Sequence, residues 1–168
     1  MTIHTSHPFA DDPDPVRRFR GRLGGAVSLW TAGSGADRSG LTVSSLMVAN
    51  GAPARVLGLL DPDADLTGTL TETGVAVVQL LEWADRDLAD AFGGTAPAPG
   101  GAFTHGSWTQ TTHGPALDDR TRVLVRLESM VESGWSVLAT VAIEDIAMVD
   151  DRRALEHRRG RYQQQGSG

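Results

Sequence analysis

The densest group of side chains that could contact a ligand is a run of hydroxyl residues between Ser39 and Leu46. The sequence there reads Ser-Gly-Leu-Thr-Val-Ser-Ser-Leu, which places Thr42, Ser44 and Ser45 close together. A strand in a barrel rarely carries adjacent hydroxyls unless they have polar partners. The run therefore predicts either a polar ligand site or a turn followed by an exposed strand face.

Other kinds of catalytic chemistry have little support in the sequence. His113 and His157 stand outside any nucleophile motif that a hydrolase would need. The chain has no cysteine, which excludes disulfides, thiolate catalysis and cysteine-ligated zinc. The Gly33-x-Gly35 pattern is followed by a predicted strand, whereas a dinucleotide fingerprint is followed by a helix. We expect no metal site and no catalytic side chain from these residues.

Bulk composition limits the class of protein. The chain has 168 residues, of which 40% are hydrophobic, so we expect one domain with a substantial core. No apolar run approaches the roughly 20 residues of a membrane-spanning helix, and no signal-peptide core is visible. The net charge of −6 argues against a nucleic-acid partner. These properties predict a cytoplasmic protein with no membrane contact.

Arginine supplies all 15 cationic side chains. Five of them gather near the C-terminal end, at positions 152, 153, 158, 159 and 161. Such a group is either a solvated segment that pairs with acidic loops or an anion site for a phosphate-bearing ligand. The sequence leaves both interpretations open.

The elements that must position these residues are mainly strands. We expect a flexible leader over 1–14, one domain over 15–163 and a flexible tail over 164–168. Predicted helices span Val16–Leu23 with Asp14 as N-cap, Asp65–Leu70 with Asp65 as N-cap and Gly74 as its stop, and Ala84–Phe92. Predicted strands span 26–30, 41–48, 56–60, 75–81, 123–128, 135–143 and about 158–162, with an exposed loop over 93–106. Strands that are not regularly separated by helices favour a closed barrel over a doubly wound sheet.

Several segments resemble the flavin reductase-like, FMN-binding split-barrel family. The hydroxyl run is similar to the family's Gly-x-Thr-x-Ser-Ser segment, which wraps the flavin ring and ribityl chain. Further similarities follow in order over residues 16–162: Pro53 to Leu60, Thr73 to Leu81, Asp87 to Phe92, Gly114 with Leu117, and the closing Leu155, Gly160 and Tyr162. The resemblance implies a mainly β fold, a six-stranded split β-barrel with a few short helices.

The resemblance also implies a function. The expected cofactor is FMN, with FAD possible, and the expected reaction is hydride transfer from NADH or NADPH to the flavin. The expected assembly is a homodimer with flavin near the subunit interface, and a flavin-dependent monooxygenase is a possible acceptor of the reduced flavin. The implied cofactor-binding residues are Leu41, Thr42, Val43, Ser44, Ser45, Asn50, Leu59, Leu60, Asp65, Thr67, Phe92, Trp135, His157 and Arg158.

Three positions depart from the family pattern. Asp65 stands where many members carry a serine for the flavin phosphate, Asn50 replaces a usual serine, and Trp135 occupies the place of a histidine on the nicotinamide side. An aspartate repels a phosphate unless cations or helix amides intervene. The alternative to a reductase is therefore a flavin-binding or flavin-carrier protein without turnover.

Two further expectations depend on these departures. We expect Arg55, Arg158, Arg159 or His157 to neutralise the charge of the phosphate. The alternative is that Asp65 points away and the backbone amides at the start of its helix bind the phosphate. Trp135 is the first inward residue of a predicted long strand, so we expect its side chain either in the barrel core or in a wall of the flavin pocket. The apolar flank of the dimer is expected on the strand faces that carry Trp135, Val137 and Val141, or Leu124.

Overall fold

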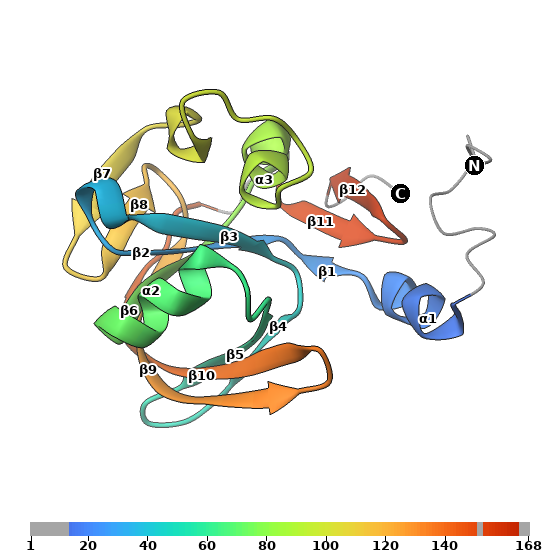
Figure 1. The fold of residues 1–168 in the computed structure, drawn as a ribbon, viewed down its shortest axis with the longest axis horizontal. Coiled ribbons are helices and arrows are strands. Elements are labelled where there is room, and N and C mark those ends of the chain that lie inside the picture. The colour runs from blue at the N-terminus through green and yellow to red at the C-terminus, as the bar shows by residue number, and fades with distance from the viewer. Residues whose placement is uncertain (1–13, 151–152, 165–168) are drawn as a thin grey trace.

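A seven-stranded antiparallel sheet dominates the protein (Figure 1). The computed structural model describes residues 14–150 and 153–164. Hydrogen bonds order the strands β3-β2-β6-β9-β10-β5-β4. These strands are β2 (Ser28–Ala32), β3 (Ser39–Val43), β4 (Leu46–Ala49), β5 (Arg55–Leu60), β6 (Val75–Leu80), β9 (Arg122–Ser133) and β10 (Ser136–Ala147).

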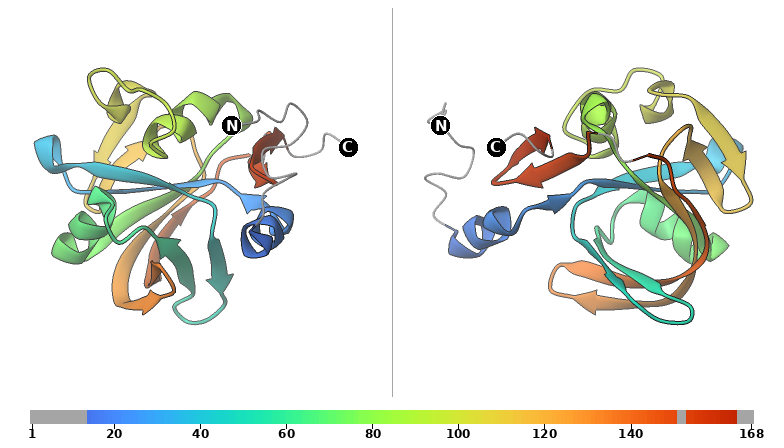
Figure 2. Two further views of the ribbon diagram at one scale, coloured as in Figure 1. Left: turned by 45° about the vertical axis from the view of Figure 1, so that its right-hand side comes forward. Right: turned by 180° about the vertical axis from the view of Figure 1, so that it is seen from behind.

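The sheet curls into a barrel because its two edge strands follow each other along the chain. Only Ser44 and Ser45 separate the end of β3 from the start of β4. The backbone N–H of Leu59 in β5 donates to the Ser45 carbonyl at 2.9 Å and holds this connection in place. Counted as one bent strand, β3 and β4 leave six strands around the barrel. The predicted split barrel is confirmed, and Figure 1 and Figure 2 show the curled sheet from three directions.

The barrel interior is filled by alternate residues of its strands. In β5, Val56 and Leu60 are buried in the core with Gly58 between them. The fully buried Trp30 of β2 lies over this glycine, and a Cβ atom at Gly58 would come within 2.6 Å of the indole. Gly58 therefore makes room for the largest side chain of the core.

A second, three-stranded sheet lies beside the barrel and joins both ends of the described chain. It consists of β1 (Gly25–Ala26), β11 (Leu155–Arg158) and β12 (Arg161–Gln164), and helix α1 (Pro15–Leu23) extends from it. The predicted cap of α1 is confirmed, since Asp14 Oδ1 accepts from the N–H of Val16 at 3.0 Å. The N–H of Arg159 donates to the Gly21 carbonyl at 2.6 Å and fastens the β11–β12 turn to α1. Figure 2 shows this group projecting from one side of the barrel.

The remaining elements pack around the sheet. They are α2 (Asp65–Thr73), α3 (Arg86–Phe92), β7 (Trp108–Thr111), β8 (Gly114–Leu117) and three short 3-10 helices, Gly35–Asp37, Trp83–Asp85 and Ala102–Thr104. Helix α2 inserts Leu66 and Leu70 into the cluster that fills the barrel. As predicted, α2 ends at Gly74, whose φ of 75° is left-handed. The cap of α2 was predicted wrongly: Ala64 is the N-cap residue and Asp65 is the first helical residue.

Buried Gln79 explains why β8 belongs to the domain. Its Nε2 donates to the Leu29 carbonyl at 3.1 Å, and its Oε1 accepts from the N–H of Leu117 at 2.8 Å. A buried amide must be satisfied in this way, so it fixes the β7–β8 hairpin against the barrel. The sequence analysis did not predict this hairpin.

The segment over 93–106, predicted as an exposed loop, partly covers a second hydrophobic cluster. Phe103 packs edge-on against Phe92 of α3, with ring centroids 4.8 Å apart, and Trp108 packs against Phe92 at 5.7 Å. The Trp108 Nε1 donates to the Phe103 carbonyl at 3.0 Å. A glycine- and proline-rich composition concealed these two aromatic anchors.

Three strand predictions need correction. The strand predicted over 26–30 is divided at Val27 between β1 and β2, which belong to different sheets. The strand predicted over 41–48 is divided at Ser44 and Ser45, and the single strand near 158–162 is a hairpin. Its turn residues, Arg159 and Gly160, have φ values of 55° and 77°, as a tight hairpin with the native twist requires. The predicted leader and tail lie outside the described residues except at their edges. There, Asp14 caps α1 and Gln164 ends β12.

Candidate functional site

A pocket, called the main pocket below, lies where the barrel meets α1 and β11. It has a volume of about 440 Å³, which is large enough for a small-molecule ligand. Its walls come from α1, the β3–β4 connection, β5, β10 and β11. The lining residues are Arg20, Gly21, Leu23, Gly24, Ser44, Ser45, Leu46, Met47, Leu57, Leu59, Leu138 and His157.

The hydroxyls of Ser44 and Ser45 stand at the mouth of this pocket. Both residues are exposed, and within the described chain no hydrogen bond uses either hydroxyl. They occupy the connection where the ladder of the barrel is interrupted, so their side chains are not committed to the sheet. These two hydroxyls can therefore donate to, or accept from, a polar ligand.

An apolar wall faces the hydroxyls. It follows from the alternation of β5, which turns Val56 and Leu60 inward and leaves Leu57 and Leu59 on the outer face. Leu138 of β10 lies directly across from Leu59 in the ladder and extends the same surface. Leu59 keeps 40% of its surface exposed, which is unusual for a leucine in a central strand. A flat apolar ring would cover this surface.

Arg20 and His157 line one side of the pocket, and Arg20 makes that side cationic. The described lining holds no carboxylate. Burial lowers the pKa of His157 below its usual value, and the positive charge of Arg20 lowers it further. At neutral pH His157 is therefore an uncharged imidazole that can donate one hydrogen bond and accept another, while Arg20 supplies the charge.

Four of the residues predicted from the sequence line this pocket: Ser44, Ser45, Leu59 and His157. Four other predicted residues have side chains that pack in the hydrophobic clusters. Val43, Leu60 and Phe92 are buried in the hydrophobic clusters, and Leu41 packs against the barrel core. From those positions only the backbone could reach a ligand.

Two predicted hydroxyls are used inside the protein. Thr42 Oγ1 donates to the Ala89 carbonyl of α3 at 2.6 Å. Thr67 Oγ1 donates to the Asp61 carbonyl at 2.6 Å, in front of α2. Both bonds hold a helix to the segment beside it. In this structure both hydroxyls form hydrogen bonds within the protein rather than facing a ligand.

The interpretation of Trp135 as barrel core is wrong. Trp135 lies in the turn between β9 and β10, after Gly134 with its left-handed φ of 58°, and its side chain is 100% exposed. The predicted dimer flank changes with it, because Val141 is fully buried in the core and Val137 and Leu124 are only partly exposed. A role for Trp135 at the edge of a flavin pocket stays a prediction.

The remaining predicted residues lie outside the lining of the main pocket. Asn50 is exposed just beyond the end of β4. Arg158 is exposed, and its side-chain carbons pack against Gly24 beside the pocket. Arg55 forms a two-pronged ion pair with Glu128, at 2.7 and 3.2 Å, and is committed there.

Asp65 lines a second pocket, between the start of β3 and the start of α2. This pocket has a volume of about 420 Å³ and includes Asp37, Arg38, Ser39 and Glu72. The Ser39 hydroxyl is buried without a hydrogen-bonding partner in the described chain. The Arg38 guanidinium stacks over the Phe103 ring at 4.4 Å. With three carboxylates against one arginine, this pocket carries negative charge.

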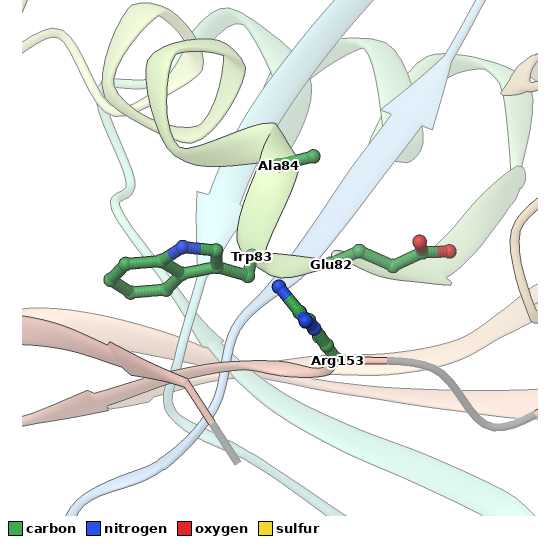
Figure 3. Close-up of a pocket in the computed structure, with 4 residues that line it drawn as sticks. All are labelled: Glu82, Trp83, Ala84 and Arg153. Carbon is green, nitrogen blue, oxygen red and sulfur yellow. The ribbon is translucent and has the colours of Figure 1, made fainter. Parts of the chain in front are cut away.

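A third pocket, of about 360 Å³, lies where the chain enters α3 (Figure 3). It is lined by Glu82, Trp83, Ala84 and Arg153. Figure 3 shows the Trp83 indole and the Glu82 carboxylate pointing to opposite sides, with Arg153 rising between them. Arg86 already stacks over the indole at 3.9 Å. None of the residues predicted for the cofactor lies in this pocket.

The sequence analysis missed part of the main pocket. Leu57 could have been found, because a strand that buries Val56 and Leu60 must turn Leu57 outward, whereas Leu138 comes from a distant strand that pairs with β5. Arg20 carried no local signal that distinguished it from the other arginines. Among the described residues no group of three metal-ligating side chains occurs, and no helix is long and apolar enough to cross a membrane.

Solved structures show where the fold recurs. The styrene monooxygenase flavin reductase of Pseudomonas putida S12 superposes with a TM-score of 0.80, at 18% identity, over 92% of this chain and 99% of that one. The NADH:FAD oxidoreductase of Streptomyces globisporus gives a TM-score of 0.80, at 20% identity, over 91% and 92%.

Sequence comparison gives the family. The chain is 30% identical over 136 residues to the FMN reductase (NADH) RutF of Acinetobacter baylyi, which covers 80% of this chain and 70% of that protein. It is 32% identical to the protein of the same name from Stutzerimonas stutzeri, over 64% of this chain and 62% of that one. Residues 20–166 match the profile of the flavin reductase like domain. The chain therefore belongs to the flavin reductase-like family.

Proposed function

We propose that the protein is a flavin reductase that passes hydride from NADH or NADPH to a flavin held in the main pocket. Family membership supports this, and so do the relatives named FMN reductase (NADH). The observation that carries it is the composition of the pocket: two uncommitted hydroxyls opposite a leucine wall, with no acid–base pair. Hydride transfer between two rings needs positioning rather than protein acid or base catalysis.

The residues of the pocket fit a flavin. The outer leucines, Leu57, Leu59 and Leu138, offer the apolar surface that a tricyclic ring would cover. Ser44 and Ser45 would hydrogen-bond its polar edge or ribityl chain. When bound, the flavin supplies the hydride acceptor. The residues of the chain would hold the ring against the leucine wall and position it for hydride transfer.

Titration tests the first step. Purified protein is titrated with FMN and with FAD, and binding is followed by flavin fluorescence and by the visible spectrum. We expect FMN to bind, because the relatives carry that cofactor in their names. If neither flavin binds, the proposed function is refuted.

Rapid mixing tests the second step. Bleaching of bound flavin is followed in the stopped flow after mixing with NADH or with NADPH, and NADH is the expected donor. A protein that binds flavin but is reduced by neither nucleotide is the alternative that the Trp135 and Asp65 departures suggest, a flavin carrier.

We also propose a homodimer. Several large apolar side chains are exposed on the barrel beside the pocket, namely Met47, Val48, Val131 and Trp135. Surfaces of this kind commonly mark protein interfaces. Sedimentation at micromolar concentration should show a dimer, and a monomer would contradict the proposal. A flavin-dependent monooxygenase as acceptor, which the neighbour from Pseudomonas putida suggests, and a cytoplasmic location stay predictions.

A further inference from the structure

Positive charge gathers on one side of an acidic protein. The net charge of the chain is −6, yet α1 alone carries four arginines, Arg17, Arg18, Arg20 and Arg22. The β11–β12 hairpin adds Arg158, Arg159 and Arg161. These seven residues are called the arginine face below.

The fold brings the two halves of the arginine face together. The bond between the Arg159 N–H and the Gly21 carbonyl joins the hairpin turn to α1, and Arg158 packs on Gly24. Figure 2 shows α1 and β11 next to each other in both views. Arg20 is the member of this face that lines the main pocket. The cations therefore border the pocket in which the ring is proposed to lie.

The start of α2 has the opposite character. Asp37, Asp65 and Glu72 line its pocket, and Asp61 and Asp63 directly precede the helix. The one arginine in the lining is held over the Phe103 ring. A phosphate dianion placed there would meet several like charges within a small volume. The amides at the start of α2 are therefore poorly placed to take a nucleotide phosphate in this chain.

We propose that Arg20, the member of the arginine face that lines the main pocket, binds the phosphate groups of a nucleotide whose ring lies in that pocket, and that the start of α2 does not. Guanidinium groups pair with phosphate through two parallel N–H bonds, which gives both strength and orientation. Neutral His157 beside Arg20 can donate a further bond. This inference rests on the proposed function, since it takes the main pocket as the ring site.

Binding of FMN and of riboflavin to three charge variants tests the inference. Arg20→Glu reverses the charge in the pocket, and Arg22→Glu makes the same change on the same helix outside the pocket lining. Arg20→Lys keeps the charge. We expect FMN affinity to fall about tenfold to a hundredfold in Arg20→Glu, with riboflavin within about twofold of the wild type. Arg22→Glu should lose less than about threefold, and Arg20→Lys should recover part of the loss. Melting temperatures establish that each variant folds.

A second measurement separates the two possible sources of phosphate. If the phosphate belongs to the flavin, the preference for FMN over riboflavin disappears in Arg20→Glu. If it belongs to the nicotinamide nucleotide, flavin affinity is unchanged and the KM for NADH or NADPH rises. Either result supports phosphate binding by Arg20.

Three results would overturn the inference. The first is that Arg20→Glu changes neither flavin affinity nor the KM of either nucleotide. The second is that FMN and riboflavin weaken equally, which would place Arg20 at the ring. The third is that Asp65→Asn tightens FMN but not riboflavin, which would place the phosphate at α2. Failure of the proposed function looks different, because riboflavin would then not bind to the wild type.

Discussion

Removing the two pocket hydroxyls should weaken flavin binding without weakening the fold. In Ser44→Ala/Ser45→Ala, neither lost hydroxyl takes part in a hydrogen bond within the described chain, and both residues are exposed. The free energy of unfolding should therefore change by less than about 0.5 kcal/mol. Each hydroxyl that bonds to a ligand contributes about 0.5–1.5 kcal/mol, so the double variant should lose about 1–3 kcal/mol of binding. This corresponds to a dissociation constant for FMN about 5- to 150-fold higher.

The neighbouring Thr42 provides the matched control. Its hydroxyl is bonded to the Ala89 carbonyl at 2.6 Å, so Thr42→Val removes a bond of the fold, while that carbonyl keeps the N–H of Gly93 at 2.9 Å. We expect this variant to lose about 1 kcal/mol of stability and little flavin affinity. Fluorescence titration gives the affinities, and urea unfolding gives the stabilities. A double serine variant that binds FMN like the wild type, or a Thr42 variant with the larger loss of affinity, would refute this assignment of the hydroxyls.

The other predictions concern pH, packing and the exposed indole. Because burial and Arg20 lower the pKa of His157 in the folded protein, the unfolded chain takes up the proton first as pH falls below about 6.5. The contribution of His157 to the free energy of unfolding should thus be complete above that pH and should be lost as the pH falls through the lowered pKa. His157→Asn should flatten the pH dependence of the urea-unfolding free energy between pH 7 and 5. An unchanged pH dependence in this variant would contradict the reasoning. Gly58→Ala should lower the free energy of unfolding by about 1–3 kcal/mol, because the new methyl group would meet the rigid Trp30 ring. Gly68→Ala, in open space on α2, should raise it by about 0.5–1 kcal/mol. Thermal melts measure both changes, and equal shifts in melting temperature would argue against the close packing at Gly58. Trp135→Ser should leave the melting temperature of the monomer unchanged, because the side chain is fully exposed. Trp135→His should speed flavin reduction in the stopped flow if a histidine at this position assists hydride transfer from nicotinamide. A slower rate would reject this second expectation.

The barrel could be predicted because local patterns agreed with the global fold. Alternation along the long strands, the cap at Asp14 and the stop at Gly74 each depend on neighbours in sequence, and all were found in the structure. The failures occurred where a few residues change direction. Ser44 and Ser45 interrupt a strand that its composition describes as continuous. Arg159 adopts a left-handed conformation that is uncommon for arginine, so no turn was expected there.

The candidate site was predictable only where it depends on one segment. Ser44, Ser45 and Leu59 belong to the hydroxyl run and the strand that pairs with it. Arg20 and Leu138 reach the pocket through tertiary contacts between segments far apart in the chain. Trp135 was misplaced because a tight turn with Gly134 puts it one position before the strand starts, so the inward alternation that begins at Val137 does not extend to it.

The small sheet beside the barrel forms a wall of the pocket that is held by fewer backbone hydrogen bonds than the walls formed by the barrel strands. β1 and β11 pair over only two residue positions, Gly25 with His157 and Ala26 with Glu156, whereas the barrel strands are held by longer ladders. Elements with few backbone bonds can open separately from the rest of a domain. The β1–β11 part of this wall is therefore expected to open more easily than the barrel strands, although buried Leu155 anchors β11 to the second hydrophobic cluster. Ligand entry and release could then proceed by local unfolding of this wall, and the amides of β1 and β11 would exchange hydrogen faster than those of the barrel.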